Sequence, residues 1–425
     1  MRPRSSRFVL LAVALMVQAC GSPSVTQPPR TPEPVASPST ILATNPSSGP
    51  PGPGSFTRGS ATDPWAPAAV AQPSAVSAAP SLQPGYFCDP CHGLAETDFL
   101  GVASTPLGLI AVGVQEPPAE AIAFVSTDGT RWAAAPGFAG GAGSTAIAVT
   151  SDGRRTVAVG LDHDGAVAWV EDGGTWRRSP EQAALQVDQA AGGMTSVVAF
   201  EGGFVAGGYR DDPVHDRASA AVWRSADGLT WRLDGTGALF AGDRIHGLAT
   251  RGGTIVAVGT VGDPNYGPAA AWRWTVAGGW QRSRIGPDTG GAMLAVTATP
   301  LGFVAVGLDA HDDGARAWTS ADGVDWTAAP DQPAFHYARL PVRMQAVAAS
   351  PRGLIAGGWR SDQGKGSAVT WTSSDGVTWQ GPVWEAAFSG AEVTGVALAS
   401  GSPVLVGRIG YPDWDQAAAW TAPLP

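Results

Sequence analysis

The chain has 425 residues, and its 36 acidic residues outnumber its 26 basic residues, which gives a net charge of -10 at pH 7. Lysine occurs once, as Lys365, and no stripe of Lys and Arg runs along the sequence. Because binding to a phosphate backbone depends on such positive charge, this composition argues against a nucleic-acid partner.

Residues 1–19 have the features of an export signal. Arg2, Arg4 and Arg7 precede an apolar run from Phe8 to Val17, which is too short to span a bilayer but suits a signal peptide. The run leads into Val-Gln-Ala-Cys20, which resembles a bacterial lipoprotein box and implies cleavage before Cys20 and lipidation of Cys20. We expect an extracytoplasmic protein anchored by lipid to the cell membrane or the outer membrane. The alternative is a plain secretory signal followed by an incidental cysteine.

Residues 20–58 are predicted to form a tether rich in Pro, Ser and Ala, and the folded domain is predicted to occupy residues 59–425. The proline-rich composition continues beyond the tether, with 15 prolines among residues 21–84. Such a segment cannot bury enough apolar surface to offset its chain entropy. In extended polyproline geometry, at ~3.1 Å per residue, it could hold a domain on the order of 200 Å from a membrane.

The segment Cys88-Asp-Pro-Cys91-His92 matches the attachment pattern of a c-type haem. In such a site two thiols hold the porphyrin and the histidine ligates the iron. The surrounding sequence offers no helical pocket for haem, so we favour a disulfide between Cys88 and Cys91 in an oxidising compartment and expect no cofactor. A haem-linked redox protein that uses Cys88, Cys91 and His92 is a third hypothesis for the function.

A unit of about 50 residues recurs along the rest of the chain, and a phrase of Trp, polar turn and Trp occurs in six of its copies. Within each copy, β-rich runs alternate with Gly and Asp turns. In the third copy the predicted strands are residues 194–200, 204–209, 220–223 and 230–233. The second strand of every copy ends in glycine, at Gly113, Gly160, Gly208, Gly259, Gly307, Gly358 and Gly407. The pattern predicts an all-β fold, a seven-bladed β-propeller with four-stranded antiparallel blades.

The seventh copy lacks a fourth strand after Trp420. Near the N-terminus, Ser60-Ala-Thr-Asp-Pro-Trp65-Ala-Pro echoes the phrase that begins at Ser320. We expect Trp65 and its flanking residues to pair as the missing strand and to close the ring, since an open edge would expose unpaired backbone groups. Proline is tolerated there because the strand is the outermost one.

Four copies contain the pattern Ser-x-Asp-Gly-x-x-Trp, which resembles the Asp-box, or BNR, repeat of sialidases and related propellers. The resemblance implies that the Asp accepts hydrogen bonds from its own turn and that the Trp packs between blades. It implies no single function, since propellers with this repeat include hydrolases, assembly factors and receptors. The four aspartates are Asp128, Asp227, Asp322 and Asp375.

Long and varied loops are predicted on the face opposite these turns, and loops on a rigid scaffold commonly carry binding. Trp359 and Trp384 also fall outside the repeat phrase. The loops are rich in Asp and could hold Ca²⁺, although solvated turns are favoured, and an ion pair between Asp162 and Arg210 is expected across neighbouring blades. The residues predicted to bind a ligand are Arg210, Asp212, Asp313, Arg360, Arg408, Tyr411 and Trp414.

An enzyme is the alternative. Sialidases that resemble this repeat use three arginines, a Tyr–Glu pair and an aspartate. Arg210, Arg360 and Arg408 supply the first residue type, and Tyr209, Tyr266, Tyr337 and Tyr411 supply phenols. The chain lacks the Arg-Ile-Pro phrase of that family, and Glu116 and Glu120 are the only glutamates placed to activate a tyrosine. We therefore expect a monomeric module that binds an envelope protein or a glycan, with a glycan-directed hydrolase as the alternative.

Overall fold

The computed structural model describes residues 66–67, 69–70, 96–186, 192–212, 217–262, 267–286, 290–310, 314–338, 340–362, 365–410 and 416–421. The chain divides into two compact units, Met1–Ser60 and Ala61–Pro425. The first unit lies outside the described residues, as do Cys88, Cys91 and His92. The signal peptide, the tether, the lipid anchor and the disulfide therefore stay predictions. No helix in the described part of the chain has the length and apolar character that a membrane span requires.

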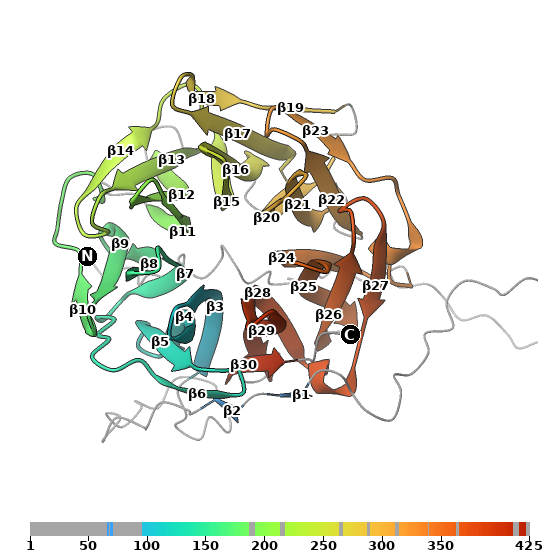
Figure 1. The fold of residues 1–425 in the computed structure, drawn as a ribbon, viewed down its shortest axis with the longest axis horizontal. Helices are drawn as coiled ribbons and strands as arrows, with labels where there is room; N and C mark the ends of the chain where they lie inside the picture. The colour runs from blue at the N-terminus through green and yellow to red at the C-terminus, as the bar shows by residue number, and fades with distance from the viewer. Residues whose placement is uncertain are drawn as a thin grey trace, which may run out of the picture. The chain divides into compact units, whose positions relative to one another are not determined.

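Seven antiparallel blades surround a central axis (Figure 1), as the repeat predicts. Blade 1 contains β3 (Glu96–Thr105), β4 (Gly108–Glu116), β5 (Glu120–Ser126) and β6 (Arg131–Ala134). Blade 2 contains β7 (Thr145–Ser151), β8 (Arg155–Asp162), β9 (Gly165–Asp172) and β10 (Thr175–Arg178). Blade 3 contains β11 (Gly192–Phe200), β12 (Gly203–Asp212), β13 (Arg217–Ser225) and β14 (Trp231–Gly235). The four strands expected in the third copy are thus confirmed.

The remaining blades repeat this order. Blade 4 contains β15 (Asp243–Arg251), β16 (Thr254–Val261), β17 (Ala269–Thr275) and β18 (Gly279–Arg282). Blade 5 contains β20 (Ala292–Thr299), β21 (Gly302–Leu308), β22 (Ala315–Ser320) and β23 (Asp325–Ala328), and blade 6 contains β24 (Val342–Ser350), β25 (Gly353–Asp362), β26 (Lys365–Ser373) and β27 (Trp379–Val383). Blade 7 contains β28 (Ala391–Ala399), β29 (Ser402–Ile409) and β30 (Gln416–Thr421). Two short 3₁₀ helices, η2 (Pro333–Phe335) and η3 (Ala386–Phe388), precede the first strands of blades 6 and 7.

The ring is closed by the N-terminal segment, as the sequence predicts. The strand β1 (Ala66–Pro67) pairs antiparallel with β30, with Pro67 opposite Trp420. In blade 5, Ala328 pairs with Trp318 and stands two residues after Trp326, and Pro67 stands two residues after Trp65 in the sequence. The register is therefore the one expected from the echo, although Trp65 itself lies outside the described residues. The next strand, β2 (Ala69–Val70), was not expected; it pairs parallel with β6 of blade 1.

The seven glycines predicted to end the second strands lie within them, since each strand continues for one to four residues beyond its glycine. Their recurrence has a steric cause. In every blade the first strand contains a register shift, for example between Ile245 and Gly247, and the second-strand glycine lies opposite the residue just before it. A Cβ added to Gly259 would lie 1.8 Å from the carbonyl oxygen of Arg244, and the other six glycines face the equivalent carbonyl at 1.7–2.0 Å. The β-bulge in the first strand brings its backbone so close to the second strand that only glycine fits at this position of the second strand.

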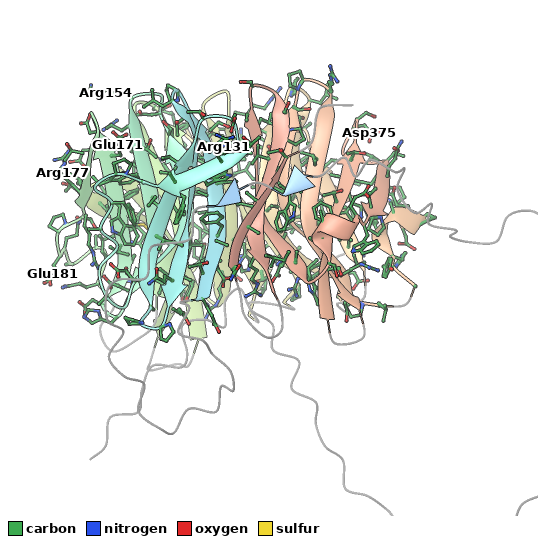
Figure 2. All side chains as sticks on the ribbon, turned by 90° about the horizontal axis from the view of Figure 1, so that it is seen from below. Arg131, Arg154, Glu171, Arg177, Glu181 and Asp375 are labelled. Carbon is green, nitrogen blue, oxygen red and sulfur yellow. The ribbon has the colours of Figure 1, made fainter. Side chains whose placement is uncertain are left out.

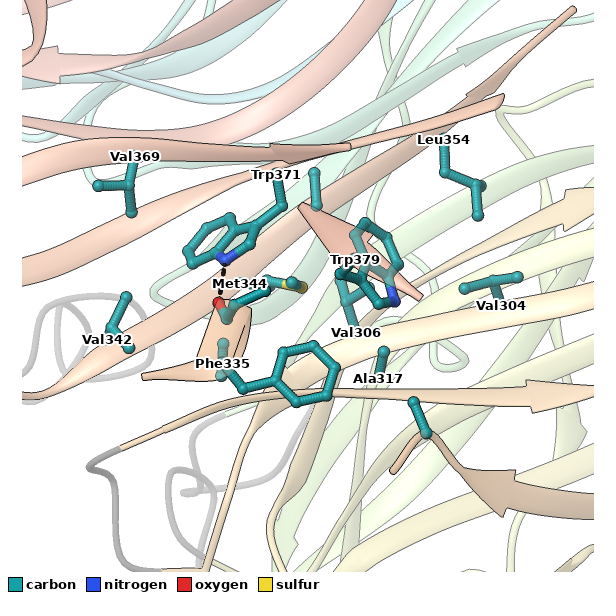
Figure 3. Packing of buried hydrophobic residues seen from close by; sticks show 14 residues of the cluster. Val304, Val306, Ala317, Phe335, Val342, Met344, Leu354, Val369, Trp371 and Trp379 are labelled. Carbon is teal, nitrogen blue, oxygen red and sulfur yellow. Dashed lines mark hydrogen bonds between the residues drawn. The ribbon is translucent and has the colours of Figure 1, made fainter. Parts of the chain in front are cut away.

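The hydrophobic core consists of seven clusters, one between each pair of neighbouring blades. Figure 3 shows the cluster between blades 5 and 6, where Trp371 and Trp379 pack with Met344 and Phe335. The indole N–H of Trp371 donates to the carbonyl oxygen of Ala334 at 2.7 Å. The third-strand tryptophans of blades 2, 3, 4 and 7 donate in the same way to a carbonyl oxygen of the connection that enters their own blade, at 2.7–3.2 Å. The repeat tryptophans therefore serve packing, which is the role that the sequence favours.

The four Ser-x-Asp-Gly turns have the hydrogen bonds expected of them. Asp128 accepts from the backbone N–H of Thr130 at 2.8 Å, and Asp375 accepts from that of Thr378 at 2.7 Å. These backbone donors lower the pKa of both carboxyls. Asp227 and Asp322 accept equivalent bonds at 2.7–2.9 Å. The turns lie with the first–second turns of each blade on what we call the short-turn face, where Figure 2 places Arg154, Glu171 and Asp375; the second–third loops and the blade connections form the long-loop face.

Candidate binding surface

The long-loop face carries the predicted ligand residues, and only some of them lie within the described part of the chain. Asp313, Tyr411 and Trp414 lie outside it, and Asp212 is described by its backbone alone, as the last residue of β12. Three arginines remain. Arg210 belongs to blade 3, Arg360 to blade 6 and Arg408 to blade 7. The structure thus places two of the three in neighbouring blades and the third elsewhere in the ring.

The side chain of Arg210 is held by a hydrogen bond to a backbone carbonyl. Its Nη2 donates to the carbonyl oxygen of Gln186 at 2.8 Å, in the connection between blades 2 and 3. The ion pair expected between Asp162 and Arg210 is absent from the described residues, because Asp162 pairs with Arg178 of its own blade. Asp162 also accepts from the backbone N–H of Asp164 at 2.8 Å. The carboxylate of Asp162 thus contacts its own blade, and Arg210 donates to a backbone carbonyl instead.

Among the described residues, Asp162, His163 and Asp164 form a group whose side chains are of types that bind metal ions. One ligand atom from each residue lies within 4.8 Å of the others. His163 pairs with Asp164 at 3.1 Å, and both side chains are more than half exposed. Since Asp162 is engaged by Arg178 and the turn backbone, the group has the contacts of a solvated turn, which the sequence favours for these loops. The expectation of no cofactor stays a prediction, with Ca²⁺ in these loops as its alternative.

Arg408 is a buried structural cation. It donates from Nη2 and Nε to Oε2 of Glu392 at 2.5 and 2.9 Å, and its Nη1 lies 3.5 Å from Oδ2 of Asp98 in blade 1. Glu392 also accepts from Arg343 of blade 6 at 3.2 Å and from Gln345 at 2.7 Å. This ionic network, defined by these five side chains, joins blades 6, 7 and 1 across the closure of the ring.

The charge state of Glu392 follows from its partners. The side chain is buried, and burial alone would raise its pKa. The cations of Arg408 and Arg343, with the hydrogen bond from Gln345, outweigh that effect and lower the pKa below its ordinary value. Asp243 in blade 4 shows the opposite balance, because burial raises its pKa more than Arg282 lowers it. Glu392 is therefore ionised at neutral pH, where it faces the cations of Arg408 and Arg343.

A second cluster of side chains in blade 6 surrounds Arg360. Its guanidinium carbon lies 4.1 Å from the ring centroid of Tyr337 and 5.3 Å from that of Trp384, and Arg360 is only 4% exposed. Trp384 is 39% exposed and the adjacent Val383 is 44% exposed. In the same blade, Arg343 lies 4.8 Å from the ring of Trp359. We call Tyr337, Arg360, Val383 and Trp384 the blade 6 patch. The sequence picks out Arg360 and Trp384 separately, but their stacking is visible only in three dimensions.

The two described tyrosines, Tyr209 and Tyr337, are covered by cations. Arg244 lies 3.8 Å from the ring centroid of Tyr209, as Arg360 does at 4.1 Å from that of Tyr337. A hollow of about 430 Å³ lies on the other face, between the turns of blade 3. Its Asp227 is bonded to its own turn, and its Arg224 pairs with Asp234 at 3.3 Å. The contacts described for the two tyrosines are thus with arginines, and Asp227 and Arg224 of the hollow are engaged by their own blade.

Comparison with known proteins supports the architecture. No protein-family model and no curated protein matches the sequence. The fold is similar to that of YCF48 bound to a D1 peptide, with a TM-score of 0.52, 12% identity, and 87% of this chain and 98% of that chain covered. It also matches a neuraminidase-like protein of subtype N10 from a little yellow-shouldered bat influenza virus (TM-score 0.40, 11% identity, 76% and 93% covered). The sialidase of Trypanosoma rangeli matches with a TM-score of 0.42 and 10% identity, over 77% of this chain and 55% of that chain. At 12% identity the similarity to YCF48 shows a shared fold and nothing more.

Proposed function

We propose that this protein is an extracytoplasmic, lipid-anchored propeller that binds a protein partner through the blade 6 patch. The observation that carries the proposal is the exposed indole of Trp384, which lies over the buried guanidinium of Arg360. Trp, Tyr and Arg are the residues that most often dominate the energy of protein interfaces. Three of them meet here, beside an exposed valine.

The patch is suited to binding because it is rigid. Arg360 is buried and lies against both rings, so Trp384 loses little freedom when a partner covers it. The ionic network of blades 6, 7 and 1 supports the strands beneath. A glycan could also stack on an exposed indole face, and a glycan-directed role is the second candidate.

Site-specific photo-cross-linking in the intact envelope tests the proposal. A benzophenone amino acid replaces Val383 in one variant and Val276 in another. Val276 is the matched control, since it is 74% exposed in the β17–β18 turn of the short-turn face. We expect a discrete adduct from position 383 that disappears when Trp384→Ala is added, and no such adduct from position 276.

Equal adducts from both positions, or an adduct that survives Trp384→Ala, would contradict the proposal. If position 383 gives no protein adduct, thermal unfolding with a panel of acidic and neutral glycans decides the second candidate. A ligand at a hundred times its Kd adds about 2.7 kcal/mol to the free energy of unfolding. A shift that Trp384→Ala abolishes would then support the glycan role.

A further inference from the structure

The outermost strand of a blade has a free edge, and in four blades the chain itself covers that edge. In blade 5 the cover is β19 (Arg284–Ile285), which continues from blade 4 and pairs parallel with β23, so that Ile285 lies opposite Trp326. In blade 1 it is β2, with Val70 opposite Trp132. Both covers begin four residues after the corresponding tryptophan of the preceding copy, Trp280 or Trp65.

Blades 3 and 6 use a glutamine side chain in place of a strand. Gln182 accepts from the backbone N–H of Trp231 at 2.9 Å and donates to the carbonyl oxygen of Leu229 at 2.8 Å. Gln332 makes the same two bonds to Trp379 and Val377, at 2.8 and 2.9 Å. The amide thus imitates a neighbouring strand by satisfying one outward N–H and one outward carbonyl.

Within the described ranges, blade 2 has neither kind of cover. The position equivalent to Gln182 and Gln332 is Phe138, six residues after the fourth-strand tryptophan of the preceding blade. Its ring packs edge-on against Trp176 at 5.0 Å but offers no hydrogen bond. The groups equivalent to those held by glutamine are the N–H of Trp176 and the carbonyl of Gly174, and no bond from a neighbouring blade to either occurs among the described residues. Figure 2 shows Arg177 of this strand at the outer rim.

The fourth-strand tryptophan is less exposed in the blades whose outer edge is covered. Trp132, Trp231, Trp326 and Trp379, in the four covered blades, are 1–4% exposed, whereas Trp176 is only partly buried. Trp280 in blade 4 is also partly buried, but Asp234 of the preceding blade accepts from its indole at 3.4 Å, and a Cβ on Gly235 would lie 3.3 Å from its ring. Blade 2 thus has an outer edge that keeps the docking geometry and has no occupant among the described residues.

We infer that the outer edge of β10 is a strand-addition site for an extended peptide segment of a protein partner. The peptide runs parallel to β10, as β19 runs along β23. An aliphatic β-branched residue lies beside Trp176, as Ile285 lies beside Trp326, and main-chain groups bond the outward N–H and carbonyl. The following residue is acidic, because it lies opposite the exposed Arg177, with the charges reversed from the Arg284–Asp325 pair of blade 5 at 2.6 Å.

The test uses the full chain and a synthetic peptide with the core Cys-Ile-Asp. In the inferred register the peptide cysteine lies opposite residue 175, so Thr175→Cys is the probe variant. Thr230→Cys is the matched control, since Thr230 precedes Trp231 as Thr175 precedes Trp176, on an edge that Gln182 covers. Disulfide adducts formed in a glutathione buffer are located by mass spectrometry of proteolytic fragments. We expect a yield at position 175 at least tenfold above that at position 230.

Two further variants exchange the covers. Phe138→Gln should install the clamp of blades 3 and 6 and reduce the yield at position 175 to that at position 230. Gln182→Ala should open blade 3 and raise the yield at position 230. Similar yields at 175 and 230, or a yield at 175 that a folded Phe138→Gln variant leaves unchanged, would overturn the inference; if that variant fails to fold, an unchanged yield at 230 in Gln182→Ala overturns it. The site lies on a different blade from the blade 6 patch, so either proposal can fail alone.

Discussion

Pro67 lies directly opposite Trp420 in the pairing of β1 with β30, and this contact joins the two ends of the described chain. The register matches that of Ala328 with Trp318 inside blade 5. The N-terminal segment therefore occupies the place of a regular fourth strand. It then continues onto blade 1 through β2, so it fastens two blades rather than one.

Deletion of residues 58–70 should lower the melting temperature, because it exposes the edge of β30 and removes the cover of β6. A loss of 1 kcal/mol shifts a domain of 150–250 residues by about 2–4 °C, so calorimetry should resolve the change. Deletion of residues 24–36, an equal length of the tether, is the control and should leave the melting temperature unchanged. Equal melting temperatures for all three proteins would exclude the closure.

Substitution of Gly259 by alanine should destabilise the fold, because the new Cβ would lie 1.8 Å from the carbonyl oxygen of Arg244. Overpacking of this kind costs about 1–3 kcal/mol. Gly286→Ala is the control, since a Cβ added to Gly286 would lie 3.4 Å from its nearest neighbour, the carbonyl oxygen of Trp326. Urea unfolding should give a lower midpoint for Gly259→Ala alone, and a midpoint equal to that of the unmodified protein would refute the steric account.

Glu392→Gln should weaken the ionic network and change how stability depends on pH. The pKa of Glu392 in the folded protein is lower than the ordinary 4.5, so its contribution is complete above that value and is lost as the pH falls through the lowered value. Loss of one partner of a buried pair costs about 3–5 kcal/mol.

The variant should therefore be less stable than the parent at pH 7, and the difference should shrink in acid. Urea unfolding at pH 7, 5 and 3 measures this, with the exposed Glu181→Gln as the control. A deficit that stays constant down to pH 3 would argue against an ionised Glu392.

Trp384→Ala and Trp371→Ala should separate binding from stability. Trp371 is 1% exposed and donates to Ala334, so its truncation should cost about 3–5 kcal/mol. Trp384 is 39% exposed, and its loss should affect the cross-link from position 383 far more than the unfolding midpoint. If Trp384→Ala destabilises the protein as much as Trp371→Ala does, Trp384 is a core residue and the blade 6 patch is not a free surface.

The fold could be predicted because the sequence signals for its strands and turns each lie within a short segment. The spacing of Gly113, Gly160 and their equivalents marks one strand in each blade, and the turn around Asp227 forms its bonds within four residues. The site depends on contacts between distant residues. Glu392 lies within a strand that reads as core sequence, and its pairing with Arg343 and Arg408 follows from the ring alone. The strand β2 escaped notice because two residues in a proline-rich stretch are too few to show the alternation of a strand.

The pairing of β1 with β30 joins the first and the last of the described strands in the chain. The residues of β1 leave the ribosome before any blade strand, whereas β30, their pairing partner, follows every other described strand. Blades 1 to 6 are each built from consecutive strands, but blade 7 is completed by a segment that is made long before its own three strands. The ring therefore cannot close until β30 has been made, and until then β1 has no partner strand and its backbone is open to chaperones or neighbouring chains.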